Sequence, residues 1–428
     1  MVNVLVIGRG GREHSICRKM SESPSVDQVY AAPGNHGMAD CAIQVPIDEM
    51  NFPEIAAFAK ENEIGLTVIG PEAPLQAGLA DFLGSLGMKV FGPKKEAAVI
   101  EGSKSFAKEL MEKYDIPTAE YRAFTDYEKA RSYLIEKGAP IVIKADGLAA
   151  GKGVTVAMTL DEAQQALEEM MVGARFGEAS AKVVIEEFLE GEEFSLMAFV
   201  NGSTVVPLEI AQDHKRAYDG DLGPNTGGMG AYSPVPHIGD AVVEEAVRTI
   251  LEPAAKAMEL EGRSFCGVLY AGLINTGQGP KVIEFNARFG DPETQAVLPR
   301  MKSDLAEAML AVIDGGKPEI DWDSQFVLGV VAASKGYPES YGKGDVLKGL
   351  SELDSSLFVF HAGTKQNEDG EFVTDGGRVL LAGARAESLS EAQEKVYAGL
   401  EKLQCDGVFY RRDIGGRAIA RLSSRTSL

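Results

Sequence analysis

A carboxylate and an amide stand two residues apart in the segment KVIEFN, which has the apolar, β-branched composition of a strand. Side chains alternate along a strand, so Glu284 and Asn286 share one face with Val282. Ile283 and Phe285 point to the opposite face. Mg²⁺ prefers oxygen ligands and completes its octahedron with water and substrate phosphates, so two protein ligands are enough. An isolated E-x-N pair is more often a solvated face, and the neighbouring segments decide between the two interpretations.

Two polar, glycine-rich loops accompany this strand. The segment ARFGDPETQ (287–295) follows it directly and places Arg288 next to an FGDP turn. A guanidinium there could clamp a carboxylate or a phosphate through two parallel hydrogen bonds. The segment AQDHKRAYDGDLGPNTGGMGAYSP (211–234) collects charged residues, among them Asp213, and five glycines. Such a density of charge and glycine is typical of a binding loop and favours the metal interpretation of the strand.

The turn GRGGREH (8–14) could bind phosphate, because it follows the first apolar strand. Its glycines would let backbone N–H groups approach an anion at a helix N-terminus. A dinucleotide-binding fingerprint needs a small residue where this chain has Glu13, so NAD binding is disfavoured. A tight turn that serves only helix packing is the alternative.

The segment ADGLAAGKGV (145–154) has a superficial likeness to a P-loop. It is one spacer residue too short and has no Ser or Thr after Lys152 to bind Mg²⁺, so it is not a Walker A motif. A strand that ends at Lys144, followed by a loop of Gly and Ala, predicts instead a mobile flap over a polyphosphate. A plain glycine-rich hairpin is the alternative.

The composition excludes several classes of function. The chain has 428 residues, of which 45% are hydrophobic, and a formal net charge of −22. This charge would repel a nucleic-acid backbone or an anionic membrane. The four cysteines form no CxxC pair, which favours a reduced, cytoplasmic setting. The five histidines show no HExxH spacing, which excludes zincin chemistry. No basic leader precedes the first strand and no apolar run reaches about 18 residues, so we expect neither export nor membrane spanning.

The order of the elements predicts three domains. Apolar runs and helical patterns alternate over residues 2–92, which is typical of βαβ units on a parallel sheet with ligands at the carboxyl ends of its strands. Mixed strands, hairpins and helices follow, and then a smaller set of strands with one helix. The fold class is therefore α/β and α+β multidomain, with expected domains at 1–100, 101–322 and 323–428.

The chain resembles the glycinamide ribonucleotide synthetase (phosphoribosylamine–glycine ligase) family of ATP-grasp enzymes. The motifs that carry the resemblance run in order as VLVIGRGGREH, PGN, GPEAPL, EGSKSFAK, IVIKADGLAAGKGV, AQDHKRAYDGDLGPNTGGMGAYSP, IEFNARFGDPETQ and FYRRDIGGRA. The resemblance implies an ATP-grasp fold with an N-terminal, Rossmann-like parallel-sheet domain and a small C-terminal α+β domain. It also implies a cytoplasmic, monomeric, single-activity enzyme of purine biosynthesis that binds neither nucleic acid nor membrane.

The resemblance further implies that ATP lies between two antiparallel sheets, with Glu284 and Asn286 as ligands of Mg²⁺ or Mn²⁺. The residues near the phosphates would be Lys104, Lys144, Gly151, Lys152 and Gly153. The residues around adenine and ribose would be Glu186, Glu187, Leu189 and Glu193. Ala271 and Gly272 stand where many ATP-grasp enzymes carry another carboxylate, so a fully coordinated second metal ion is in doubt.

Glycine and 5-phosphoribosylamine are the substrates that the resemblance implies. The phosphate of phosphoribosylamine would bind near Gly10, Gly11 and Asn35, with Asp213 near its amine or ribose. Glycine or the transferring phosphoryl group would face Arg288 and the loop residues Pro224, Asn225, Thr226 and Gly227. The residues expected to take part in catalysis are Lys144, Asp213 and Arg288.

The expected reaction follows from the chemistry of amide formation, because a carboxylate is a poor electrophile at neutral pH. Glycine would first take the γ-phosphoryl group of ATP, and the amine of phosphoribosylamine would then displace phosphate from glycyl phosphate. Another ATP-grasp ligase or carboxylase of purine metabolism is the alternative, although it should lack the DHKRAYDGD and FGDPET loops. A nucleotide-binding dehydrogenase or a non-catalytic nucleotide sensor is a more distant alternative, which Glu13 and the Lys144, Glu284 and Asn286 set oppose.

Overall fold

The computed structural model describes residues 1–147, 153–173 and 181–426. The N-terminal region holds a five-stranded parallel sheet in the order β3-β2-β1-β4-β5. Its strands are β1 (Val2–Gly8), β2 (Val26–Pro33), β3 (Ile43–Gln44), β4 (Ile64–Ile69) and β5 (Val90–Phe91), and its helices are α1 (Gly11–Ser21), α2 (Phe52–Glu61), α3 (Glu72–Ala77) and α4 (Leu79–Ser85). The predicted parallel sheet is confirmed. Its strands form because short runs such as Val4–Ile7 are buried on both faces.

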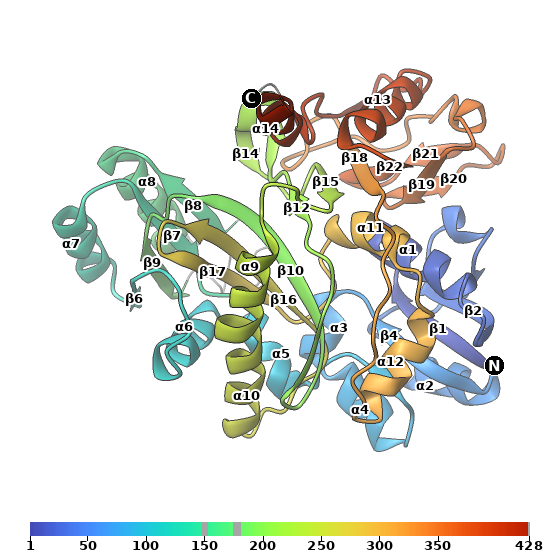
Figure 1. The fold of residues 1–428 in the computed structure, drawn as a ribbon, viewed down its shortest axis with the longest axis horizontal. Coiled ribbons are helices and arrows are strands. Elements are labelled where there is room, and N and C mark those ends of the chain that lie inside the picture. Colours follow the sequence, from blue (N-terminus) through green and yellow to red (C-terminus); the bar gives the residue numbers. More distant parts are fainter. Residues whose placement is uncertain (148–152, 174–180, 427–428) are drawn as a thin grey trace.

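Two antiparallel sheets follow (Figure 1). The first has the order β6-β9-β7-β8 and is covered by α7 (Tyr127–Lys137) and α8 (Leu160–Met171). Its strands are β6 (Tyr121–Phe124), β7 (Ile141–Ala145), β8 (Val154–Ala157) and β9 (Val183–Glu187). The second has the order β11-β10-β16-β17, with β10 (Glu192–Asn201), β11 (Thr204–Pro207), β16 (Cys266–Thr276) and β17 (Gly279–Asn286). Residues 188–191 join β9 of the first sheet to β10 of the second.

Helices α5 (Lys95–Gly102) and α6 (Lys104–Lys113) connect the parallel sheet to these two sheets. The helices are separate because Ser103 adopts an extended conformation and its Oγ accepts the N–H of Phe106 at 3.1 Å, which caps α6. Lys104 is therefore the first residue of α6. Helices α9 (Asp240–Ala246) and α10 (Glu252–Leu260) precede β16 in the chain and pack against the same core.

The last large sheet combines strands of the long polar loop with strands of the C-terminal region. Its path is β12-β15-β18-β22-β19, and β23 pairs with β18. The strands are β12 (Gln212–Asp213), β15 (Gly230–Ser233), β18 (Phe326–Ser334), β19 (Leu357–His361), β22 (Arg378–Ala386) and β23 (Val408–Phe409). The sheet thus takes strands from both sides of the boundary expected at 322/323. That boundary stays a prediction, although β12 and β15, near the two ends of the long loop, pair within the sheet of the C-terminal strands.

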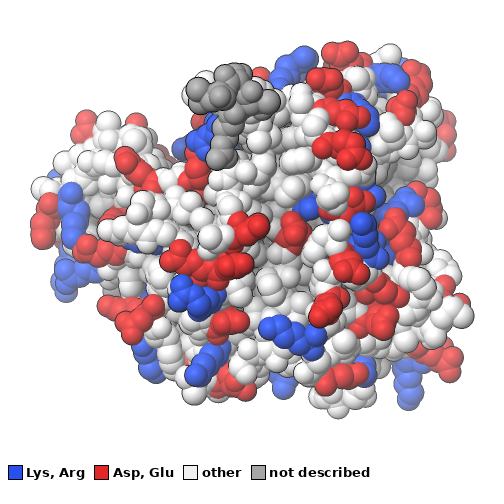
Figure 2. Space-filling view, in the orientation of Figure 1, with Lys and Arg blue, Asp and Glu red and all other residues white. Residues whose placement is uncertain are grey.

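The other α-helices and strands lie in the long loop, after β17 and in the C-terminal region. They are β13 (Arg216–Tyr218), β14 (Leu222–Asn225), α11 (Glu293–Val297), α12 (Leu305–Ile313), β20 (Thr364–Gln366), β21 (Phe372–Thr374), α13 (Leu389–Leu400) and α14 (Gly416–Thr426). Within the described ranges, no helix is both long and apolar enough to cross a membrane. Acidic and basic side chains are interspersed over the face in Figure 2, as expected for a surface that the acidic excess keeps solvated.

Candidate active site

The strand expected to carry the metal ligands contains a β-bulge. Glu284 pairs with Gly272 and Val282 with Leu273, so Ile283 has no partner of its own on β16. The strict alternation expected for this strand is wrong at that point: Val282 and Phe285 are both buried in one core. Glu284 and Asn286 are each only partly buried. They remain two residues apart beyond the bulge, so they still share a face.

A buried triad of charges lies where β7, β9 and α6 meet. The carboxylate of Glu186 is 3.0 Å from Nζ of Lys144 and 3.0 Å from Nζ of Lys108. Lys144 also donates to the carbonyl of Ile283 at 2.9 Å, the residue that the bulge leaves over. Burial lowers the pKa of Lys108 to about 8, although Glu186 opposes this shift. The side chain of Glu186 therefore forms ion pairs with two lysines. The family resemblance placed Glu186 near adenine and ribose and did not predict these ion pairs.

A third lysine, Lys104, lies at the start of α6 and points toward the glycine-rich segment. Its Nζ donates to the carbonyl of Gly147 at 2.9 Å. Gly151 and Lys152 lie outside the described residues. Gly153 lies within them, and its carbonyl accepts the N–H of Ala145 at 2.8 Å, which continues the pairing of β7 with β8. The two antiparallel sheets thus bring Lys104 and Lys144 to the same region as the bulge of β17.

Lys215, in the long loop, faces Glu284, an expected metal ligand. Its Nζ is 3.7 Å from Glu284 and 3.9 Å from Glu193, the expected ribose ligand. Burial would raise the pKa of Glu284, but Lys215, followed by Lys144 and Lys104, lowers it below its usual value. Burial raises the pKa of Asp213 to about 8 against the opposing effect of Lys215. Lys215 therefore lies near an anionic carboxylate of β17, Glu284, and a readily protonated one of its own loop, Asp213.

Arg288 is held by carboxylates of the protein itself. Its Nη2 lies 2.9 Å from Glu101 and its Nε 3.6 Å from Glu72. Glu101 is buried and also accepts the N–H of Ala287 at 2.8 Å. A substrate anion that meets Arg288 would therefore share it with two glutamates. Glu101 could have been noticed as the first residue of the motif EGSKSFAK, but the sequence does not show what it contacts.

The expected phosphate turn at the start of α1 is already capped. The N–H of Gly10 donates to the carboxylate of Glu13 at 2.7 Å. The amide of Asn35 donates to the carbonyls of Arg9 at 2.7 Å and His361 at 3.0 Å, and its oxygen accepts the N–H of Gly37. Gly10 and Asn35 thus have partners within the protein, and their binding of substrate phosphate stays a prediction. The Glu13 carboxylate in this turn also opposes a dinucleotide pyrophosphate there.

The other expected contacts lie around the hinge and the long loop. Glu187 is exposed and accepts the N–H of Glu120 at 3.1 Å, and Leu189 is half-buried. Asn225 donates to the carbonyl of Val154 at 3.3 Å, which ties the loop to β8. Pro224 precedes Asn225 in β14, and Thr226 and Gly227 follow it. The structure thus brings the loop next to the sheet that contains β8, and the roles of these residues stay predictions.

A second group of possible metal ligands, His14, Asp40 and Cys41, has ligand atoms within 4.8 Å of one another. Three observations oppose a metal. The N–H of His361 donates to Nδ1 of His14, so the proton of the neutral ring occupies Nε2 and leaves no lone pair there. Asp40 is paired with Arg18. Burial raises the pKa of the Cys41 thiol to about 12, so no thiolate is available.

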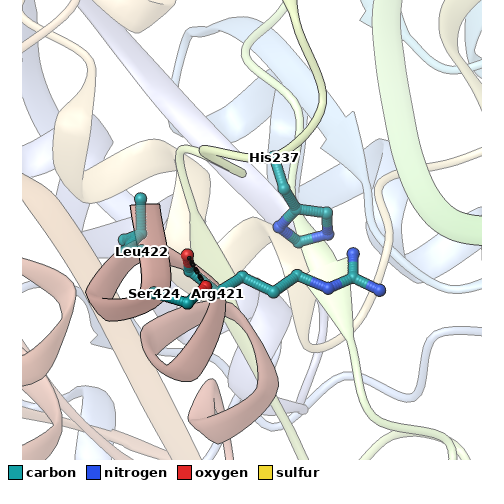
Figure 3. Close-up of a pocket in the computed structure, with 4 residues that line it drawn as sticks. All are labelled: His237, Arg421, Leu422 and Ser424. Carbon is teal, nitrogen blue, oxygen red and sulfur yellow. Dashed lines mark hydrogen bonds between the residues drawn. The ribbon is translucent and has the colours of Figure 1, made fainter. Parts of the chain in front are cut away.

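A pocket of about 250 Å³ lies beside α14, lined by His237, Arg421, Leu422 and Ser424 (Figure 3). Arg421 extends beneath the ring of His237 in this view and is paired with Glu192. Burial lowers the pKa of His237, which keeps the ring neutral. None of the expected site residues lines this pocket, and its arginine is already neutralised. It is therefore separate from the arrangement of lysines and carboxylates around β17.

Three family models together match almost the whole chain. They describe the phosphoribosylglycinamide synthetase N domain at residues 2–101, the ATP-grasp (A) domain at residues 102–294 and the C domain at residues 327–417. This chain belongs to the phosphoribosylglycinamide synthetase family. The family assignment fits the geometry, since the A-domain match contains the two antiparallel sheets and every lysine discussed above.

Full-length relatives of the family agree. The chain is 59% identical over 427 residues to the phosphoribosylamine–glycine ligase of Halalkalibacterium halodurans, covering 99% of this chain and 100% of that protein. It is 59% identical over 419 residues to the same enzyme of Listeria innocua, covering 97% and 100%. The crystal structure of phosphoribosylamine–glycine ligase from Thermotoga maritima has a TM-score of 0.84 at 36% identity, covering 96% of this chain and 100% of that one. Biotin carboxylase of Campylobacter jejuni, at 16% identity and a TM-score of 0.70, shares the fold.

Proposed function

We propose that this chain joins glycine to 5-phosphoribosylamine with the conversion of ATP to ADP and phosphate, giving glycinamide ribonucleotide. The membership of its three domains in one synthetase family and its full-length similarity to phosphoribosylamine–glycine ligases support this function. The single structural observation that carries it is the convergence of Lys104, Lys144 and Lys215 on the face of β17 that bears Glu284. The enzyme is a carbon–nitrogen ligase of purine biosynthesis.

The residues at this face fit a divalent cation bound with nucleotide. Glu284 is ionised, since three lysines lower its pKa. Asn286 makes no side-chain hydrogen bond to any residue in the described ranges, so its amide oxygen is free to act as a ligand. Glu284 and Asn286 would hold Mg²⁺ or Mn²⁺, which when bound neutralises charge on the phosphates. Ala271 and Gly272 on the neighbouring strand bring no further carboxylate.

The protein's own part in the reaction is to bind, orient and neutralise. Lys104 and Lys144 would pair with ATP phosphates, and Lys215 with oxygens that become more negative as the phosphoryl group moves to glycine. Arg288, fixed by Glu101 and Glu72, would orient the glycine carboxylate. Asp213 would lie near the incoming amine, which is nucleophilic without a dedicated base. Glycyl phosphate is labile in water, so the loops around β17 must exclude solvent during its lifetime.

The test is ADP formation that requires both glycine and phosphoribosylamine. Glycine labelled with ¹⁸O in its carboxylate should deliver one labelled oxygen to the released phosphate, because that oxygen bridges carbon and phosphorus in glycyl phosphate. Unlabelled phosphate would rule out this intermediate. ADP formation that depends on bicarbonate instead would support the alternative, a carboxylase with the same fold.

The setting of the enzyme is part of the same proposal. The free cysteines Cys17, Cys41, Cys266 and Cys405 support a reduced, cytoplasmic compartment. We infer a monomer with small-molecule substrates alone and no nucleic-acid or membrane partner. Sedimentation at the concentration used for the assay tests the oligomeric state, and a dimer would contradict it.

A further inference from the structure

The two loops assigned to glycine and the transferring phosphoryl group touch each other through a glycine. Gly228 has a φ of +116°, and a Cβ built there would lie 2.3 Å from Cδ of Pro292 in the FGDP turn. Only glycine adopts this backbone conformation without strain and leaves room for the proline. The backbone of Gly228 therefore packs directly against the ring of Pro292.

Arg378, the first residue of β22, binds both loops at this contact. Its Nη1 donates to the carbonyls of Gly227 and Asp291, each at 3.0 Å. Its Nη2 lies 3.0 Å from the carboxylate of Asp291. Burial would raise the pKa of Asp291, but Arg378 is the largest influence that lowers it, so the pair is charged. One guanidinium thus holds three acceptors on two loops in a planar array.

Tyr337, which follows β18, completes the attachment. Its hydroxyl accepts the N–H of Gly227 at 2.9 Å, so two side chains of the C-terminal region bind the two polar groups of one residue. A Cβ at Gly227 would lie 3.1 Å from Cζ of Arg378 and 3.2 Å from the Tyr337 hydroxyl. The glycines of the TGG sequence are therefore needed for the approach of Arg378 and Tyr337 as well as for the turn.

The position of Gly227 affects the lysine at the metal face. Thr226, its neighbour, donates to the carbonyl of Lys215 through its N–H at 2.7 Å and through its Oγ1 at 2.8 Å. The Nζ of Lys215 lies 3.7 Å from Glu284. A shift of the 226–228 segment would therefore displace the backbone that carries Lys215.

We propose that Arg378 is a positioning residue for the glycine site: it fixes the distance between the 226–228 segment and the FGDP turn, with Tyr337 in a supporting role. The inference rests on the proposed function, which assigns these two loops to glycine and the transferring phosphoryl group. It gives the C-terminal domain a part in positioning the site, although none of its residues was expected to contact a substrate. In the proposed function Lys104 and Lys144 pair with the ATP phosphates and do not contact Arg378, whereas Lys215 acts on the phosphoryl group as it moves to glycine. A displaced loop should therefore affect the use of glycine more than the binding of ATP.

The experiment compares Arg378→Met and Arg378→Lys with Arg385→Met in the full-length chain. Arg385 lies on the same strand, is 42% exposed and pairs with Asp323 at 3.5 Å, so it controls for loss of an arginine from β22. Arg378→Met should raise the KM for glycine about tenfold, equivalent to about 1.4 kcal/mol, with the KM for ATP within about twofold of the parent. Arg378→Lys should have a KM for glycine between those of the parent and Arg378→Met, because one ammonium cannot hold three acceptors in a plane. Arg385→Met should retain both parental KM values.

Equal increases in both KM values, or an unchanged KM for glycine, would overturn the inference. If thermal unfolding shows that Arg378→Met is not folded, Tyr337→Phe tests the inference instead, because it removes only the hydroxyl that accepts the Gly227 N–H. It should raise the KM for glycine selectively but less than Arg378→Met, and a parental KM would overturn the inference. A parent that forms no ADP in response to glycine would instead refute the proposed function.

Discussion

Glu186 and Glu187 are neighbours on β9, but Glu186 is buried and Glu187 is exposed. Replacing each by Gln measures how much the negative charge of Glu186 in the buried triad contributes to stability. Glu186 is 4% exposed and lies 3.0 Å from both Lys144 and Lys108. The side chain of Glu187 is 44% exposed and lies 3.9 Å from Lys281. Glutamine keeps the shape of either side chain, and it can still accept the Glu120 N–H that Glu187 accepts.

The two variants should differ strongly in the stability that they lose. Removing one partner of a buried ion pair costs about 3–5 kcal/mol, because the remaining charge stays buried without compensation. Removing one partner of an exposed pair costs about 0–1 kcal/mol. Glu186→Gln should therefore lower the free energy of unfolding by about 3 kcal/mol or more, and Glu187→Gln by less than about 1 kcal/mol.

The pH dependence of the loss identifies its origin. Burial lowers the pKa of Lys108 to about 8 from 10.5, and Glu186 is the largest influence that raises it. Without Glu186 the pKa falls further. Between the folded and unfolded pKa values the unfolded chain binds more protons, so stability rises with pH in that window. In Glu186→Gln the lower folded pKa of Lys108 makes this rise in stability begin at a lower pH than in the parent. The stability deficit of the variant should therefore shrink as the pH rises to about 8, and it should stay constant at higher pH.

Urea unfolding of the parent and both variants, measured over a pH series without nucleotide, is the assay. Saturating ATP should then recover more stability in Glu186→Gln than in the parent, since polyphosphate supplies the missing negative charge. Equal losses in the two variants, or a deficit in Glu186→Gln that does not change with pH, would refute the account of Glu186 as the anion that neutralises the two lysines.

Four further substitutions test other parts of the structure. Glu284→Gln should lower turnover about a hundredfold, equivalent to about 3 kcal/mol, and weaken Mn²⁺ binding followed by electron paramagnetic resonance; unchanged Mn²⁺ affinity would remove it from the metal site. The pKa of Asp413 is about 2 despite partial burial, because Arg411 binds it, so its contribution is present above pH 3.8 and lost toward pH 2; the stability difference between parent and Asp413→Asn should disappear over that range. Gly228→Ala should destabilise by about 1–3 kcal/mol, since its φ is +116° and its Cβ would meet a proline ring. Gly84→Ala, in a helix with open space around it, should stabilise by about 0.5–1 kcal/mol, and thermal unfolding of both glycine variants checks the opposite signs.

The sequence was sufficient for the elements whose signal is local. β1 and β4 are short runs that are buried on both faces, and the turns after them contain the expected glycines and prolines. The pair Glu284 and Asn286 could be predicted to share a face because they are two residues apart. The bulge at Ile283 could not be predicted, since it depends on how β17 pairs with β16. It changes which neighbours are buried without separating the pair.

Other site residues were missed because their surroundings come from distant parts of the chain. Lys108 reads as a surface lysine on an amphipathic helix, and only the packing of β9 against α6 buries it next to Glu186. Arg378 stands 87 positions beyond Asp291 and 151 beyond Gly227. A lone arginine at the start of a strand carries no local signal for either contact. Spacing reveals which residues share an element, whereas the partners of a buried charge depend on tertiary packing.

The net charge of −22 does not oppose the binding of ATP, because the field in the site is set by its nearest groups. Lys144 and Lys108 share one buried carboxylate, which leaves one positive charge in excess in that triad. Surface carboxylates more than a Debye length away, about 8 Å at physiological ionic strength, are largely screened. Lys108, Lys144 and Lys215 each have a carboxylate partner when the site is empty, and Lys104 donates to the carbonyl of Gly147. A polyphosphate therefore enters a region whose positive groups are already held in place, so its binding does not require them to be ordered first.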